Sequence, residues 1–265
     1  MDAPMYFFLG HLSLNDLLLS TTIEPEMLQI ILREGTAMSK PGCFTQLYFF
    51  CVPTANECLL LTVMSYDRYL AVCCPLRYSS IMDVKLCILL ATLSWECAIL
   101  IALPHIIILH AMTFCGSNII NHFYCDLIPL LKLSCSDTSA NEEIITIGSI
   151  PMVFVPFSFI SITYFNIIVA ILRISTSSGR EKAFSTCSSH LTSVCMYYGT
   201  LVFNYLIPSK GQYIGLQKMI SVCYTVVIPL LNPVIYSLRN EEITRALTRF
   251  YFQLISSTFF VSYTS

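Results

Sequence analysis

An acidic and a basic residue stand side by side where a long apolar run of the sequence ends. The run extends from Phe44 to Met64, and Asp67 and Arg68 follow it closely. Charged groups directly after a membrane-length run mark the boundary between lipid and water, and such a flank helps to fix the topology of a spanning helix. We therefore expect Asp67 and Arg68 to lie at one surface of a membrane.

Two further carboxyl groups interrupt apolar runs near their middle. Asp16 lies about midway along residues 5–29, and Glu57 about midway along residues 44–66. Because a charged group at the centre of a bilayer costs about 2.5–3.5 kcal/mol, both side chains should face the interior of a helix bundle. Each is then either a neutral acid hydrogen-bonded to a neighbouring helix or part of a joint site for a cation or a shared proton.

The composition indicates an integral membrane protein. Of the 265 residues, 55% are hydrophobic and 11% are charged, whereas a soluble domain carries about 25% charged residues. Six apolar runs meet or approach the roughly 20 residues that cross a bilayer as a helix, without the strict alternation of barrel strands. They cover residues 5–29, 44–66, 87–109, 144–172, 190–208 and 216–238. The net charge of −2 gives no hint of a nucleic-acid partner, and no nucleophile–base or metal-ligand spacing indicates an enzyme.

The basic residues favour an orientation in which Asp67 and Arg68 face the cytoplasm, with nine Lys or Arg inside and five outside. The inner set is Arg68, Arg77, Lys85, Arg173, Arg180, Lys182, Arg239, Arg245 and Arg249. The outer set is Arg33, Lys40, Lys132, Lys210 and Lys218. Both termini then lie inside. Residues 241–249 are typical of a short amphipathic helix at the interface, and the apolar tail 250–265 is too short to span.

Four of the thirteen cysteines lie on the outer side in this orientation, where disulfides form. They are Cys43, Cys115, Cys125 and Cys135. Four cysteines allow three connectivities, which spacing does not separate. The other nine are expected to be free thiols in spans or at inner ends. His122 beside Cys125 suggests a zinc ligand pair, but no CxxC-like framework accompanies it, so we expect no metal site.

Three motifs resemble one family. Met64 to Tyr78 reads Met-Ser-Tyr-Asp-Arg-Tyr-Leu-Ala-Val-Cys-Cys-Pro-Leu-Arg-Tyr, which is similar to the olfactory receptor form of the Asp-Arg-Tyr motif in rhodopsin-like G-protein-coupled receptors. Residues 182–191, followed by Tyr197-Tyr-Gly199, resemble the sixth helix of that family. Residues 229–240 carry its Asn-Pro-x-x-Tyr element at Asn232 to Tyr236.

The resemblance covers about residues 4–249 and implies a rhodopsin-like bundle over residues 1–249. The span at residues 5–29 resembles the family's second helix, so the six spans correspond to family helices 2–7, and the chain starts one helix late. The resemblance also implies a switch for G-protein coupling. Its residues are Asp67, Arg68, Tyr69, Tyr164, Lys182, His190, Tyr198, Asn232, Pro233 and Tyr236.

Three further sites follow from the resemblance. Asp16, Glu57 and Asn232 map onto the family's inner polar site, where a sodium ion or a shared proton would be held without any other cofactor. The disulfides implied are Cys43–Cys125 and Cys115–Cys135. The ligand would contact Phe50, Cys51, Thr54, Ala55, Gly148, Met152, Leu201, Tyr205, Val222 and Thr225.

The function expected is that of an odorant receptor at the plasma membrane. It would bind small, mostly apolar volatile molecules and activate a heterotrimeric G protein of the stimulatory olfactory type, which raises cyclic AMP. Two alternatives remain. A truncated receptor would be retained in the endoplasmic reticulum without signalling, and an ion or proton transporter would use Asp16 and Glu57 but would show inverted repeats.

Overall fold

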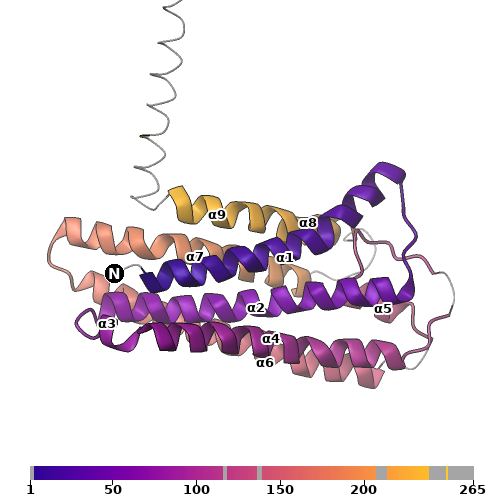
Figure 1. Ribbon diagram of the computed structural model, residues 1–265, viewed down its shortest axis with the longest axis horizontal. Coiled ribbons are helices and arrows are strands. Elements are labelled where there is room, and N and C mark those ends of the chain that lie inside the picture. The colour runs from indigo at the N-terminus through magenta and orange to yellow at the C-terminus, as the bar shows by residue number, and fades with distance from the viewer. Residues whose placement is uncertain (1–2, 116–117, 136–138, 207–213, 239–248, 250–265) are drawn as a thin grey trace, which may run out of the picture.

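The computed structural model describes residues 3–115, 118–135, 139–206, 214–238 and 249, and within them the regular elements are helices (Figure 1). The long helices are α1 (Ala3–Arg33), α2 (Lys40–Cys73), α4 (Val84–Ala111), α6 (Ser139–Leu172) and α7 (Ser177–Leu206). The shorter ones are α3 (Tyr78–Ile81), α5 (Leu127–Lys132), α8 (Ile214–Val222), the π-helix η2 (Cys223–Val227) and α9 (Ile228–Leu238). The all-helical membrane bundle expected from the apolar runs is confirmed.

Helix α2 is the element around which the others pack. Its 34 residues correspond to about 51 Å at 1.5 Å per residue. It contacts α1, α4, α6 and α7, and buried residues follow one another from Cys43 to Leu70. Ser39 caps its first turn by accepting a hydrogen bond from the Gly42 N–H at 3.2 Å, and Pro41 occupies the first turn, where no helical N–H is needed.

Four segments of the described chain are long and apolar enough to cross a membrane. They are Lys40–Cys73, Val84–Ala111, Ile150–Leu172 and Lys218–Tyr236. The other two expected spans, residues 5–29 and 190–208, lie in α1 and largely in α7, which are as long but carry more polar side chains. That both cross the membrane remains a prediction. The expected span at residues 216–238 is formed by α8, η2 and α9 in succession.

The two ends of the bundle differ in character (Figure 1). The end with α3 holds the charged residues that follow the apolar part of α2. The opposite end, near α5, is joined by disulfides between Cys43 and Cys125 and between Cys115 and Cys135, with Cα–Cα distances of 5.5 Å and 5.8 Å. These are the pairs that the family resemblance implies.

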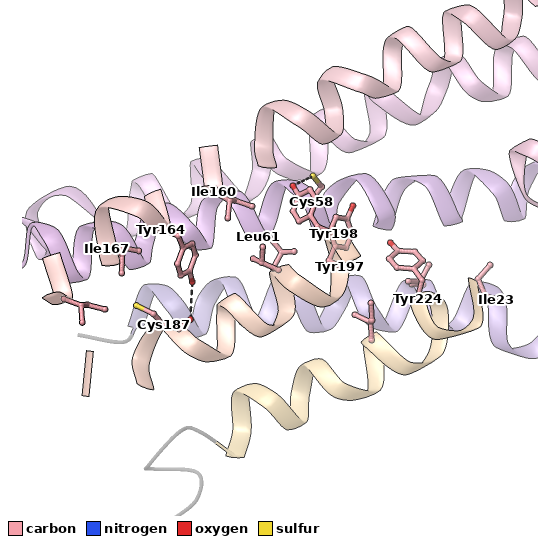
Figure 2. Close-up of a cluster of buried hydrophobic side chains, with 14 of the residues drawn as sticks. Ile23, Cys58, Leu61, Ile160, Tyr164, Ile167, Cys187, Tyr197, Tyr198 and Tyr224 are labelled. Atoms are coloured by element: carbon pink, nitrogen blue, oxygen red, sulfur yellow. Dashed lines mark hydrogen bonds between the residues drawn. The ribbon is translucent and has the colours of Figure 1, made fainter. Parts of the chain in front are cut away.

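The largest hydrophobic core cluster runs through the centre of the bundle, between α2, α6, α7 and η2 (Figure 2). Leu61, Tyr197 and Ile167 are almost completely buried there. Five buried tyrosines contribute polar atoms to this apolar region, so each hydroxyl requires a partner from another part of the chain. The contacts of these hydroxyls define the candidate site.

Candidate functional site

The inner end of α2 holds a closed ion pair. The Arg68 guanidinium donates to Oδ2 of Asp67 through Nη2 at 2.6 Å and through Nε at 3.0 Å. The Tyr78 hydroxyl at the start of α3 donates to the other carboxylate oxygen, Oδ1, at 2.7 Å. Asp67 is fully buried and Arg68 is 3% exposed. Both oxygens of the carboxylate are therefore engaged, and Arg68 is turned away from any other acceptor.

Hydrogen bonds at His190 join α2, α6 and α7, deeper in the bundle than the ion pair. The fully buried His190 of α7 contacts the Leu61 carbonyl oxygen of α2 through Nε2 at 3.0 Å and the Tyr164 hydroxyl of α6 through Nδ1 at 2.7 Å. Because a carbonyl only accepts, Nε2 carries a proton. The single proton of the Tyr164 hydroxyl is shared between Nδ1 of His190 and the Cys187 carbonyl oxygen, which lies 3.2 Å from the hydroxyl (Figure 2). The buried hydroxyl of Tyr236 has no hydrogen-bond partner among the described residues.

The carboxyl groups at the middle of the bundle face one another across α1, α2 and α9. Asn232 donates through its amide to both Asp16 oxygens, at 3.2 Å and 3.4 Å. Ser193 of α7 donates to the Asn232 amide oxygen at 3.2 Å, and Tyr224 of η2 donates to Glu57 at 3.4 Å. Asp16 is 5% exposed and Glu57 is 2% exposed. The structure thus brings together the three residues expected at the polar site.

The outer part of α2 lies under a cluster of aromatic rings. The Phe50 ring centroid is 5.1 Å from that of Tyr124 and 6.2 Å from that of Tyr224. The Tyr197 hydroxyl donates to the Thr54 carbonyl oxygen at 2.9 Å. Two residues expected to touch the ligand, Met152 and Leu201, pack against the same core cluster. Thr225 is fully buried, and its hydroxyl donates to the Ser221 carbonyl oxygen at 2.9 Å.

The remaining residues expected to touch the ligand are more scattered. Ala55 belongs to a separate cluster formed against α4, and Cys51 contacts that cluster as well as the disulfide-linked outer one. Gly148 is exposed, and Val222 is half-buried. The side chain of Tyr205 lies outside the described residues.

The other residues expected in the switch are spread over α2, α7 and α9. Tyr69 is half-buried against the core, and the Tyr198 hydroxyl is 3.0 Å from the Cys58 thiol (Figure 2). Pro233 lies within α9, next to Asn232. The side chain of Lys182 lies outside the described residues, as do the expected interfacial helix at residues 241–248 and the tail 250–265.

Three titratable groups lie near the aromatic cluster, in the loop before α5 and at the start of that helix, where Tyr124 is buried and His122 and Asp126 are half-buried. Burial lowers the pKa of His122 from its ordinary value, and the neighbouring Lys218 lowers it further, against the opposing effect of Asp126. Burial raises the pKa of Asp126, while His122 and the Leu127 N–H act against the rise. Burial also raises the pKa of Tyr124. The loop therefore holds polar groups out of water directly over the Phe50 ring.

Several residues of the site are not predicted from the sequence, although its motifs and spacing point to some of them. Tyr78 is the last residue of the motif that contains Asp67 and Arg68, and its hydroxyl donates a hydrogen bond to the Asp67 carboxylate. Tyr124 directly precedes Cys125, whose disulfide to Cys43 lies about two helical turns from Phe50. That spacing places Tyr124 over Phe50. Nothing in the spacing connects Tyr224 with Glu57, since 167 residues separate them.

One face of α2 connects all of these levels. Phe50 contacts the outer rings, Thr54 accepts from Tyr197, and Glu57 accepts from Tyr224. Further inward, the Leu61 carbonyl meets His190, and Arg68 closes on Asp67. Steps of three or four residues keep these positions on one side of a helix. The same face of α2 thus carries the contacts to α7 and η2 at the outer end and the ion pair at the inner end.

Comparisons with known proteins agree with this arrangement. The protein-family model described as olfactory receptor matches residues 1–254. Olfactory receptor 5G9 of Mus musculus is 46% identical over 249 residues, which cover 94% of this chain and 79% of that protein. Olfactory receptor 1M1 of Mus musculus is 44% identical over 258 residues, covering 97% and 82%. Olfactory receptor 8H1 of Homo sapiens is 45% identical over 249 residues, covering 94% and 80%.

Proposed function

The chain belongs to the olfactory receptor family, and from that premise we propose that it binds small, mostly apolar volatile molecules and raises cyclic AMP through a stimulatory G protein. It is a multi-pass membrane receptor of the G-protein-coupled type rather than an enzyme. The ligand class, the second messenger and the plasma membrane as its location are parts of the proposal.

The observation that carries the proposal is the shared face of α2. The rings around Phe50 and the ion pair at Arg68 are eighteen positions apart on one helix, or about 27 Å. Between these two ends, α7 contacts the same face at two levels, through Tyr197 at the Thr54 carbonyl and through His190 at the Leu61 carbonyl. A receptor needs such a connection between its ligand and its G-protein surface.

The outer cluster supports an apolar ligand. Phe50, Met152 and Leu201 provide apolar surface, and desolvation of that surface favours an oily molecule. The Thr54 and Thr225 hydroxyls already donate to carbonyls within their own helices. Position 50 is Phe, where amine receptors carry an acid, which argues against a cationic amine as the ligand.

Activation would be a shift between two pre-existing states. In the state described here, Arg68 is held by Asp67 and Tyr164 is held by His190. Movement of the inner end of α7 would withdraw His190, free the Tyr164 hydroxyl and let Arg68 turn toward Tyr164 and the unpaired Tyr236 hydroxyl. A shift from mostly inactive to mostly active requires about 5 kcal/mol of differential ligand binding.

A cyclic AMP reporter assay with surface staining tests the proposal. Cells that display the receptor are exposed to a panel of apolar volatile molecules, and we expect at least one to raise cyclic AMP. Phe50→Ala should weaken that response, whereas Phe49→Ala, which removes a neighbouring ring that is 49% exposed, should leave it unchanged. A receptor that reaches the surface and responds to none of the panel, or a response equally sensitive to both variants, would contradict the proposal.

A further inference from the structure

A buried glutamine in the outer part of α2 contacts two other segments at once. Gln46 is 7% exposed. Its Nε2 donates to the Thr22 carbonyl oxygen of α1 at 3.1 Å, and its Oε1 accepts from the Cys125 backbone N–H at 2.9 Å. A carbonyl only accepts and an N–H only donates, so the orientation of the amide is fixed. One side chain of α2 therefore joins α1 to the loop before α5.

The contact with α1 lies close to a bend in that helix. Pro25 has no N–H to offer the Thr21 carbonyl oxygen, and its ring opens the helix at this turn. The hydroxyls of Thr21 and Thr22 each donate at 2.7 Å to a carbonyl oxygen one turn earlier, which also bends helices. Figure 1 shows α1 turning away from α2 toward its C-terminal end. Gln46 thus holds α2 to α1 near the point where the two helices diverge.

The contact with the loop lies beside the region expected to hold the odorant. Cys43, which forms the disulfide to Cys125, precedes Gln46 by about one turn of α2, and Phe50 follows Gln46 by about one turn. The N–H that Gln46 accepts from belongs to the peptide unit between Tyr124 and Cys125. A disulfide fixes the position of Cys125, whereas a hydrogen bond to this peptide unit also fixes the direction in which Tyr124 leaves the chain. The Tyr124 ring centroid then lies 5.1 Å from that of Phe50.

We propose that Gln46 is a positioning residue for the odorant site, which holds the Tyr124 ring over Phe50 and uses α1 as its second anchor. The inference rests on the proposed function, since it requires an odorant to bind beside Phe50. Without the amide, the disulfide remains, but the Cys125 N–H loses its acceptor and the Tyr124 ring is no longer held in one direction. A site that is not held ready binds its ligand more weakly. The G-protein surface at the other end of α2 is untouched, so the maximal response is retained.

Dose–response curves with an odorant that activates the unaltered receptor provide the test. Gln46→Met keeps the length of the side chain and removes both hydrogen bonds. It should raise the concentration that gives half-maximal cyclic AMP by about five-fold or more, as expected for an unpaired buried N–H, with the maximal response unchanged at equal surface density. The matched control is Gln29→Met, which makes the same change at an exposed position of α1 and should leave both quantities unchanged.

Gln46→Glu provides a conservative variant. In its neutral form the carboxyl group donates and accepts as the amide does, and burial beside a carbonyl oxygen favours that form. This variant should reach the surface and respond at nearly the concentrations that the unaltered receptor requires. An unchanged half-maximal concentration in Gln46→Met, an equal loss in Gln29→Met, or a Gln46→Glu as weak as Gln46→Met would overturn this inference and leave the proposed function standing. A surface receptor that no odorant activates would contradict the proposed function itself.

Discussion

The Asp67 carboxylate is satisfied by two different residues, and each can be removed separately. Arg68 occupies one oxygen and Tyr78 the other. Tyr78→Phe deletes only the hydroxyl and leaves one buried carboxylate oxygen without a donor. Such a loss costs about 1 kcal/mol or more, and it falls on the closed state. We expect ligand-free cyclic AMP signalling to rise by about five-fold or more, since basal activity follows the population of the open state.

The control for this variant lies next to the ion pair. Tyr66 is half-buried one residue before Asp67 and contacts Phe159 through its ring, so Tyr66→Phe tests the general effect of losing a tyrosine hydroxyl. It should leave basal signalling unchanged. Unaltered basal signalling in Tyr78→Phe at normal surface density would show that the hydrogen bond does not hold the closed state.

The loop histidine should make the outer face sensitive to acid. The pKa of His122 is lowered by burial, so the folded loop binds fewer protons than the unfolded chain. Above the ordinary pKa of histidine, about 6.5, His122 is neutral in the folded and unfolded states, and its burial does not reduce the free energy of unfolding. Below that pH the free energy of unfolding decreases, until the pH reaches the lower pKa that His122 has in the folded state. We expect thermal stability in detergent to decline between pH 7 and pH 5, as measured by fluorescence melting.

His122→Gln isolates this contribution, because the variant keeps a polar side chain that does not titrate. The raised pKa of Asp126 acts with the opposite sign, since a carboxyl group that is easily protonated in the folded state favours folding in acid. Without His122 the pKa of Asp126 should rise further, because His122 acts against that rise, and this also favours the variant in acid. The difference between their melting temperatures should therefore shift in favour of the variant as the pH falls. A constant difference would contradict the assignment.

At the scale of elements, the apolar runs predicted the long helices well and their ends poorly. Five of the six runs lie within a described helix or a succession of helices, and the sixth does so as far as residue 206, because a helix satisfies the backbone of some 20 apolar residues in lipid. The apolar run at residues 190–208 predicts only the second part of α7. The helix itself begins earlier, at Ser177. Its first turns are polar, with Arg180 and Glu181 among them, and hydropathy alone does not indicate a helix that continues beyond the bilayer.

The cross-helix partners were largely beyond reach from a single sequence. Spacing placed Phe50, Glu57 and Arg68 on one face of α2, because the period of a helix is fixed. Which helices meet that face depends on tertiary packing. The pairing of His190 with both Tyr164 and the Leu61 carbonyl joins positions up to 129 residues apart, and no local signal records it. The π-helix at Cys223–Val227, which presents Tyr224 to Glu57, was not foreseen either.

The two disulfides should differ in their effect on stability. Cys43–Cys125 spans 82 residues, and Cys115–Cys135 spans 20. The loss of chain entropy in the unfolded state grows with the loop, so the longer bond should contribute about 1 kcal/mol more. It also holds Tyr124 over Phe50. Replacing both members of the longer pair with serine should lower the melting temperature and the odorant response, while the shorter pair should affect them less. Equal losses in both would contradict this account.

At the scale of the whole molecule, α2 is the helix that connects the proposed ligand site with the proposed G-protein surface. Helix α2 packs against α1, α4, α6 and α7 and is therefore held on several sides. Its hydrogen-bonding contacts with α7 are few. Among the described residues these contacts are Tyr197 to the Thr54 carbonyl, Tyr198 to the Cys58 thiol and His190 to the Leu61 carbonyl. Few directional contacts between α7 and α2 are what a moving helix requires, because a small number of hydrogen bonds can be exchanged without disturbing the apolar core.

The distance between the inner ends of α2 and α7 tests this account most directly. Spin labels can be placed at Leu76→Cys, after α2, and Phe184→Cys, in the first part of α7, since the two side chains are 97% and 60% exposed. The exposed native cysteines would be serine in this background. We predict that an activating odorant lengthens the label separation by several ångströms, as Arg68 leaves Asp67. An odorant that raises cyclic AMP while the measured distance stays unchanged would contradict the account.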